Sequence, residues 1–188
     1  MVLSEADAEL FYEIFFPLLS YVNIKKKVIK GLKAFDMNDH INDTDAHQIA
    51  QKLWDDPAII DRYISDNKDK LNEEKIEILQ GFKRAHRGMF FVERILKKGA
   101  VLIGSSRVKG EGDTAYLVSG IISEWDELTG YMTLPVRIQC TLLPFKGVII
   151  PDGLIYIYPG IFFGPGIRSS LKDTYNKVRK TTGLVTTL

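Results

Sequence analysis

The spacing of apolar residues changes at Gly88, and this change constrains the fold more than any other feature of the sequence. Before Gly88, apolar residues recur every three or four positions, as they do on the buried face of a helix. After Gly88, short runs rich in Val, Ile, Leu, Tyr and Phe are separated by turn residues, with no helical pattern between them. The sequence therefore predicts an α+β protein, in which an N-terminal helical region packs on a C-terminal antiparallel β meander or small barrel.

The helical region is expected to contain five helices, most of them with a recognisable start signal. Ser4, Asn72 and the pair Asp56 and Pro57 are typical of helix N-termini. Pro17 is expected to kink or shorten the first helix, because proline lacks the N–H that a helix interior needs. The predicted helices begin after Ser4, span 23–35, and begin after Thr44, Asp56 and Asn72.

The β region is expected to contain five or six strands and a closing helix. The strands are predicted at 89–96, 100–108, 114–124, 131–143 and 147–158, and the helix at 168–181. We divide the chain into a helical region, 1–87, and a barrel-like region, 88–188. Because several predicted helices are short and need a packing surface, the two regions are expected to unfold as one cooperative unit.

Charge is distributed unevenly between the two regions. The 188-residue chain has a net charge of +1, but residues 1–80 carry ten basic and sixteen acidic side chains, and residues 81–188 carry fifteen and eight. The small total excludes a strongly polycationic or polyanionic role for the whole chain. Any electrostatic partner must therefore be recognised by a local surface.

The single cysteine, Cys140, excludes an internal disulfide and a cysteine-rich zinc site, and a reducing cytoplasm is the expected location. The N-terminus carries acidic residues where a secretion signal carries Lys or Arg, and the apolar stretch 10–24 is interrupted by polar residues. Neither secretion nor membrane insertion is expected. Cys140 alternates in phase with Val136, Ile138 and Leu142, which predicts a buried and unreactive thiol.

The segment 143–153, with the sequence LPFKGVIIPDG, resembles a segment of uncharacterised small bacterial proteins that place a helical region before a β region. The resembling segment forms a strand, a turn and a second strand. No catalytic residue is attached to it. The resemblance therefore implies a fold and no activity.

Acidic residues and histidines gather between positions 36 and 47, but their spacing does not match a calcium loop. Such a loop needs Gly at its sixth position and Glu at its twelfth, and counting from Asp36 these positions are Ile41 and His47. A shared helical face of Asp36, His40, Asp43 and His47 would suit a divalent ion, but Asp43 to Asp45 look like the cap of a helix. We expect a solvated loop and cap, and no metal or other cofactor.

Two glycine-containing segments have features of phosphate sites. Gly110 to Ala115 fits a loose dinucleotide pattern, but a strand follows it, so a hairpin turn is the better interpretation. The segment 164–170 leads into the last helix with an arginine and two serines, which are suited to binding an anion. The candidate anion site consists of Gly166, Arg168, Ser169 and Ser170.

A basic run extends from Lys83 to Lys109 and includes Phe90 and Phe91. Cations with aromatic side chains on a small barrel are typical of proteins that bind single-stranded nucleic acid, although one of two adjacent phenylalanines in a strand must face the core. The candidate binding residues are Lys83, Arg84, Arg87, Arg94, Lys97 and Lys98, with His86, Arg107 and Lys109 nearby.

The sequence contains neither the GxSxG motif of many hydrolases nor the HExxH motif of metalloproteases, so no catalytic residue is assigned and an enzyme is not the favoured interpretation. We expect a cytoplasmic, non-catalytic module that binds a peptide or a protein. Binding of single-stranded nucleic acid through the basic β face is the alternative.

Overall fold

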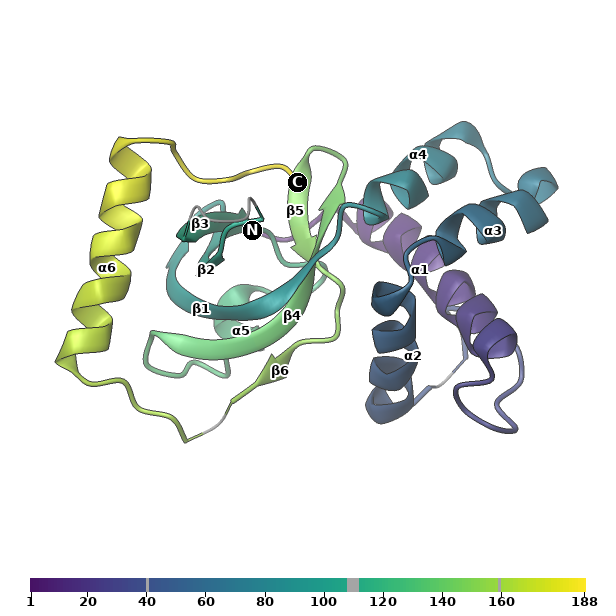
Figure 1. Ribbon diagram of the computed structural model, residues 1–188, viewed down its shortest axis with the longest axis horizontal. Coiled ribbons are helices and arrows are strands. Elements are labelled where there is room, and N and C mark those ends of the chain that lie inside the picture. The colour runs from purple at the N-terminus through teal and green to yellow at the C-terminus, as the bar shows by residue number, and fades with distance from the viewer. Residues whose placement is uncertain (40, 108–111, 159) are drawn as a thin grey trace. The chain divides into compact units, whose positions relative to one another are not determined.

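The computed structural model describes residues 1–39, 41–107, 112–158 and 160–188, and the chain divides into two compact units (Figure 1). The helical unit is Ser4–Ala85, and the β unit is Met1–Leu3 together with His86–Leu188. The chain therefore starts in the β unit, forms the helical unit and returns at His86. The α+β class expected from the sequence is confirmed.

The helical unit contains four α-helices and one short 3₁₀ helix within the described residues. Three of the α-helices begin at side-chain caps, because Ser4, Asn42 and Asn72 each accept a hydrogen bond from the backbone N–H three residues later. The elements are α1 (Glu5–Lys26), α2 (Asp43–Asp55), α3 (Ile59–Asp66), η1 (Lys68–Lys70) and α4 (Glu73–Phe82).

Stacked aromatic rings form the core of the helical unit. Phe11 and Phe15, one turn apart on α1, have ring centroids 5.1 Å apart, and the edge of Phe82 from α4 packs against Phe11 at 6.1 Å. Ile49 and Leu53 of α2 are fully buried as well. The helix-type spacing recognised in the sequence thus corresponds to the buried faces of α1, α2 and α4.

The helix predicted over 23–35 does not form, and that prediction is wrong. Helix α1 is not shortened at Pro17 and continues to Lys26, after which Lys27 adopts a left-handed conformation with φ 52°. The side chain of Asn23 then accepts a hydrogen bond from the backbone N–H of Ile29, and Ser20 accepts one from Phe35. These side-chain contacts satisfy backbone groups that a second helix would have paired.

Within the described residues, the β unit contains one six-stranded mixed sheet. Antiparallel pairing joins β1 to β2, β2 to β3, β4 to β5 and β4 to β1, and a short parallel pairing of Val118 with Ile149 joins β3 to β5. Five strands thereby form a closed ring of pairings, and β6 pairs with β4 outside it. The strands are β1 (His86–Leu96), β2 (Gly99–Ser105), β3 (Asp113–Val118), β4 (Val136–Phe145), β5 (Val148–Pro151) and β6 (Tyr156–Ile157).

Three long predicted strands differ in the structure from what the sequence suggested. The run 147–158 is divided into the two short strands β5 and β6. The run 114–124 ends as a strand at Val118, and the run 131–143 is a strand only from Val136. Between them lies the short helix α5 (Trp125–Leu128), whose Trp125 is almost fully buried and donates its indole N–H to the carbonyl of Val118 at 2.9 Å. Because Trp125 is buried in the core, this segment does not continue the sheet.

Side chains fill the interior of the ring. Alternate residues of the strands point inward, among them Phe90, Ile138 and Cys140. Gly104 allows the Phe90 ring to approach closely, since a Cβ at that position would lie 2.5 Å from Phe90 Cδ1. The ring therefore encloses a packed core.

Helix α6 (Pro165–Lys180) covers the outer face of β1 to β3 (Figure 1). The closing helix predicted over 168–181 is confirmed and begins three residues earlier than expected. Among the helices that the structure describes, none combines the length and the apolar character needed to cross a bilayer. The buried side chains of this layer are Val101, Ile103, Ala115, Leu171, Tyr175 and Val178.

Candidate functional site

The outer face of β1, β4 and β6 carries cross-strand rows of side chains, of which Phe91 packs against the layer beneath α6. These residues alternate along their strands with inward-facing core residues, so they point away from the ring. Met89 and Tyr156 remain 50% and 52% exposed. The rows are Phe91 opposite Arg137, and Met89 opposite Gln139, which in turn faces Tyr156.

Arg137 is held on this face by its neighbours. Its guanidinium carbon lies 5.0 Å from the centre of the Tyr158 ring, and its Nη2 lies 2.9 Å from Met89 Sδ, to which it donates. Tyr158 donates its hydroxyl proton to Gln139 Oε1 at 3.0 Å. Cation–π and hydrogen-bonding contacts therefore orient the arginine without neutralising its charge.

The segment that leads from β6 to α6 forms one wall beside this face. The ring of Phe163 packs edge-on against Phe91 with centroids 5.3 Å apart, while the next ring, Phe162, is 89% exposed. Arg168, in the first turn of α6, donates its Nε proton to the carbonyl of Phe163 at 2.9 Å. The contacts of Phe163 and Arg168 anchor this segment and leave Phe162 in solvent.

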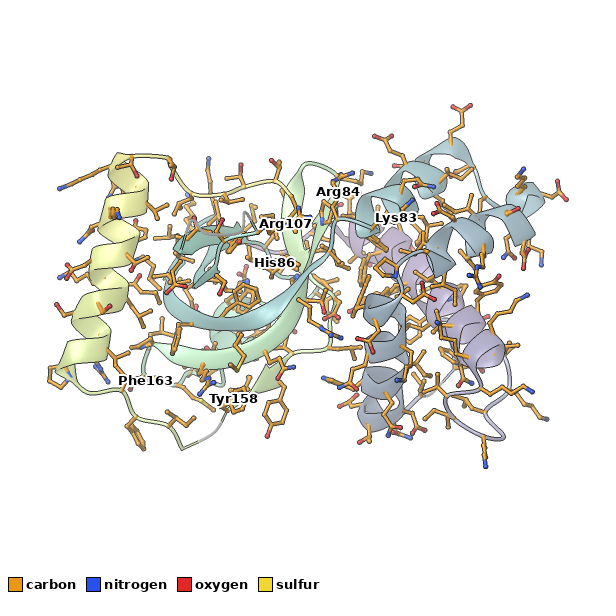
Figure 2. All side chains as sticks on the ribbon, in the orientation of Figure 1. Lys83, Arg84, His86, Arg107, Tyr158 and Phe163 are labelled. Carbon is orange, nitrogen blue, oxygen red and sulfur yellow. The ribbon has the colours of Figure 1, made fainter. Side chains whose placement is uncertain are left out.

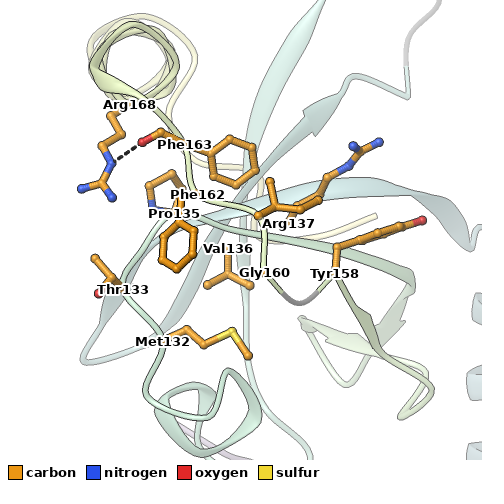
Figure 3. Close-up of a pocket in the computed structure, with 11 residues that line it drawn as sticks. Met132, Thr133, Pro135, Val136, Arg137, Tyr158, Gly160, Phe162, Phe163 and Arg168 are labelled. Carbon is orange, nitrogen blue, oxygen red and sulfur yellow. Dashed lines mark hydrogen bonds between the residues drawn. The ribbon is translucent and has the colours of Figure 1, made fainter.

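Part of this face and the segment that leads to α6 line a cavity of about 230 Å³, here named the aromatic groove (Figure 3). Most of the lining side chains are apolar or aromatic, and the two charged ones are arginines. In Figure 3 the Arg137 and Arg168 guanidinium groups lie on opposite sides of Phe162. The lining residues are Met132, Thr133, Pro135, Val136, Arg137, Tyr158, Gly160, Ile161, Phe162, Phe163 and Arg168.

Two larger hollows are lined by residues of a different character. One, of about 510 Å³ in the helical unit, has Glu13 and Lys75 in its lining, and these two pair with each other at 2.8 Å. The other, of about 530 Å³ beside α6, is lined largely by hydroxyl and charged side chains. Neither presents an exposed aromatic ring comparable to Phe162.

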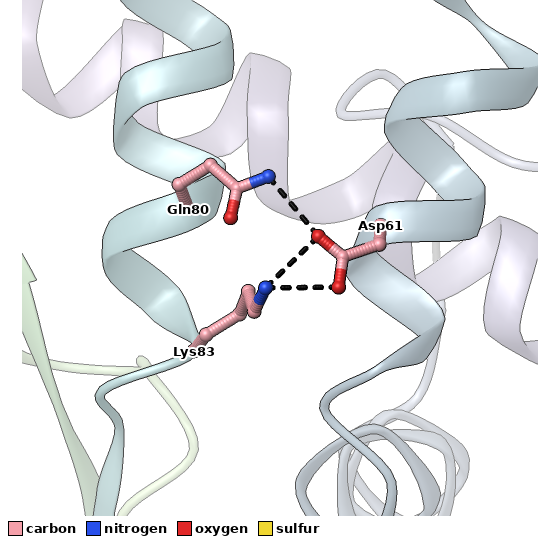
Figure 4. Close-up of polar contacts among 3 residues, drawn as sticks. All are labelled: Asp61, Gln80 and Lys83. Carbon is pink, nitrogen blue, oxygen red and sulfur yellow. Dashed lines mark hydrogen bonds and ion pairs between the residues drawn. The ribbon is translucent and has the colours of Figure 1, made fainter.

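The first of the predicted binding residues, Lys83, makes contacts within the helical unit. Its Nζ lies 2.9 and 2.8 Å from the two carboxylate oxygens of Asp61, and Gln80 donates to the same carboxylate at 3.1 Å (Figure 4). The bond from Lys83, followed by that from Gln80, lowers the pKa of Asp61. Arg84 follows in the same unit and is exposed.

The other four basic candidates are spread along the first hairpin of the β unit. Arg87 is exposed near the start of β1, while Lys97 and Lys98 form its turn to β2, roughly 30 Å away along the chain at about 3.3 Å per residue. Arg94 pairs with Glu93 and stacks on Tyr175 of α6, its guanidinium carbon 3.7 Å from the ring centre. The structure does not gather these four residues into one cluster.

The candidate anion site contributes one residue to the aromatic groove. Helix α6 begins at Pro165 after the N-cap Gly164, and the four predicted residues lie in its first turns. Arg168 lines the groove, whereas Gly166, Ser169 and Ser170 do not.

The acidic segment before α2 acts as a loop and cap in the part that is described. Asp36 Oδ1 accepts the backbone N–H of Asn38, and α2 begins at Asp43 behind the cap Asn42. Over the described ranges, no group of three or more His, Cys, Asp and Glu side chains is placed to hold a metal ion.

Three of the predicted residues, His40 of that segment and Lys109 and Gly110 of the glycine-containing turn, lie outside the described residues. The strand expected after the turn is present as β3.

His86 is half-buried at the start of β1, in the same unit as Arg107 (Figure 2). Its Nε2 lies 3.0 Å from the carbonyl oxygen of Ser105, which can only accept, so this nitrogen carries the proton. Burial lowers the pKa of His86; the contact with Ser105 raises it, and the charge of Arg107 lowers it. The histidine therefore favours its neutral form.

Cys140 is buried, as its strand phase predicted. Burial raises the pKa of its thiol well above the ordinary value, and the charge of Asp152 raises it further. A nucleophilic cysteine requires the opposite shift.

Arg137, Tyr158 and Phe162 are not among the residues predicted from the sequence. A signal was available, because four aromatic residues fall within 156–163, directly before the glycines of the last helix.

Comparisons of the chain with family models, with curated proteins and with solved structures found no match.

Proposed function

We propose that the β unit binds a segment of another polypeptide in the aromatic groove. The observation that carries this proposal is Phe162, a phenylalanine that is 89% exposed at the edge of a cavity. Met132 and Ile161, which also line the cavity, are exposed hydrophobic residues as well. Contiguous exposed apolar side chains mark interaction surfaces, and aromatic residues with arginine dominate the energetics of such surfaces.

The size of the groove favours one side chain of a longer ligand over a whole small molecule. Its volume of about 230 Å³ is below the roughly 300 to 1,000 Å³ of typical small-molecule sites. A peptide that inserts one bulky side chain and lays its backbone across the outer face of β4 and β6 matches these dimensions. Binding of this kind requires no catalytic group.

Selection from a peptide library followed by measurement of affinity tests the proposal. Random dodecapeptides displayed on phage are selected against the full chain, and one selected peptide is synthesised with a fluorescent label. The variant Phe162→Ala should weaken its binding about tenfold or more, since truncating a central aromatic residue has effects of this size. Its melting temperature should not change.

The matched control is Ile122→Ala. Ile122 is another exposed apolar residue of the β unit, 66% exposed, and it does not line the groove. Equal binding by Phe162→Ala and the wild type would contradict the proposal, as would the absence of any selected peptide.

Nucleic acid is the alternative ligand, because exposed rings and arginines also stack on bases. A labelled twelve-nucleotide oligo(dT) tests it with the same variants. If it were the ligand, the logarithm of its affinity would fall linearly with that of salt concentration, by about 0.7 per phosphate contacted. Replacing Arg94, Lys97 and Lys98 with Ala would then flatten the slope. We expect no such binding at physiological salt.

A further inference from the structure

We propose that the segment bound in the aromatic groove is acidic, with Asp or Glu residues on both sides of one bulky apolar side chain, and that Arg137 and Arg168 select it. This inference rests on the proposed function and adds the charge of the ligand to it. It is carried by the state of two arginines that line the same cavity from different elements, β4 and the start of α6.

Arg137 is oriented but not neutralised. Of its five N–H donors, one is directed to the weakly accepting sulfur of Met89 at 2.9 Å. The ring of Tyr158, 5.0 Å from the guanidinium carbon, restricts the side chain further. Such an arginine loses little conformational entropy when it binds a carboxylate, so most of the interaction energy is retained.

Arg168 is oriented in a similar way from the other side of Phe162 (Figure 3). Its Nε proton goes to the carbonyl of Phe163 at 2.9 Å, which leaves the donors of the two terminal nitrogens for a ligand. In the described part of the chain, neither Arg137 nor Arg168 pairs with a carboxylate. The contrast is Arg94, whose guanidinium is paired with Glu93.

The charged residues that line the groove favour a ligand of negative charge. Both charged residues that line it are cationic, and none of the described lining residues is acidic. An acidic ligand therefore meets complementary charge on both sides of the apolar centre, whereas a basic ligand meets repulsion on both sides. Carboxylates suit this arrangement, because guanidinium groups bind them with two parallel hydrogen bonds.

A synthetic nonapeptide tests this inference on the full chain. It has a central tryptophan with three glutamates on each side and a glycine at each end; its analogues carry glutamine or lysine in place of every glutamate. Binding is followed by chemical-shift changes in the protein spectrum. The glutamate peptide should bind about tenfold more tightly than the glutamine analogue at low salt, and the lysine analogue should bind least.

Variants assign the preference to the two arginines. Arg137→Ala and Arg168→Ala should each weaken binding of the glutamate peptide about three- to tenfold more than they weaken binding of the glutamine analogue. Arg179→Ala is the matched control, because Arg179 is an exposed arginine of α6 outside the groove. Phe162→Ala should weaken both peptides.

The outcomes separate the two proposals. Equal affinity for the glutamate and glutamine peptides, with Phe162→Ala still weakening both, would overturn the acidic preference and leave peptide binding intact. Binding of neither peptide, with no selected library peptide sensitive to Phe162→Ala, would overturn both. A stronger response to the oligonucleotide than to the glutamate peptide would assign the arginines to phosphate instead.

Discussion

The outer surface of the β unit has two faces, and they differ in how far their apolar side chains are buried. On β1 to β3, helix α6 buries Val101, Ile103 and Ala115 completely or nearly so. On β1, β4 and β6, Met89 and Tyr156 stay about half exposed. A sheet face whose apolar side chains are buried stabilises the fold. A face whose apolar side chains stay in solvent adds little to the stability of the fold until a partner covers it.

Two arginines show the same contrast. Arg94 on the covered face has both a carboxylate and an aromatic ring as partners, and its side chain is 32% exposed. Arg137 on the uncovered face has an aromatic ring and a sulfur atom. The arginine on the covered face therefore supports the fold, while the one on the uncovered face is not paired with a carboxylate among the described residues.

The largest expected effect comes from a matched pair of tyrosines. Tyr175→Ala removes a ring that is 4% exposed and the stacking partner of Arg94, so the free energy of unfolding should fall by about 3 to 4 kcal/mol. Tyr156→Ala on the uncovered face should lower it by less than about 1 kcal/mol. Urea denaturation measures both, and equal losses would remove the distinction between the faces.

The two arginines provide the next test. Arg94→Ala should lower the free energy of unfolding by about 1 to 2 kcal/mol, because a stacked and partly buried guanidinium is lost. Arg137→Ala should change it by less than about 0.5 kcal/mol. Chemical denaturation of both variants is the measurement, and a larger loss for Arg137→Ala would mean that the uncovered face also supports the fold.

Cys140 reports on the interior of the ring, which lies beneath both faces. Its pKa is raised in the folded chain, so its contribution to stability is full below the thiol pKa of the unfolded chain, about 9. Above that pH, the free energy of unfolding should fall by about 1.4 kcal/mol per pH unit until the folded thiol also ionises. Cys140→Ala should lose this part of the pH dependence, as measured by denaturation between pH 8 and about 10.

Accessibility gives a second readout of the same thiol. A thiol reagent should label native Cys140 slowly and label it quickly after denaturation. Rapid labelling of the native chain would show that the ring interior opens readily.

The smallest effect is expected for an exposed contact in the helical unit. Lys83→Ala removes the ion pair with Asp61, whose side chains are 36% and 49% exposed, and should lower the free energy of unfolding only slightly because water screens the pair. A double-mutant cycle with Asp61→Asn measures the pair itself. A coupling as large as the loss measured for Arg94→Ala would mean that exposed contacts alone can stabilise the fold to the same extent.

Local features of the structure followed from the sequence. Ser4 and Asn72 start helices where capping chemistry places them, and the change of period near Gly88 separates helices from strands. Cys140 is buried because its alternation with apolar neighbours places it on the inner face. Each of these features depends on residues within a few positions of one another, and short-range patterns report them reliably.

Other local predictions failed because particular side-chain contacts outweighed the apolar pattern. The apolar spacing over 23–35 is compatible with a helix, but Ser20 and Asn23 of α1 bind the backbone of that segment. The run after Val118 is compatible with a strand, but Trp125 is buried and binds the carbonyl of Val118. Propensity is weak enough for a few specific contacts to override it.

By itself the sequence determined that this chain forms helices first and a sheet afterwards, because the period of apolar residues is a local property. Only the tertiary structure decided which strands pair and which side chains meet. Met89, Arg137 and Tyr158 come together because β4 pairs with β1 on one side and with β6 on the other, and Arg168 lines the groove from the start of α6. These pairings depend on registers between distant segments, which no local pattern encodes. For this reason the basic run stood out in the sequence, while the aromatic groove emerged only from the fold.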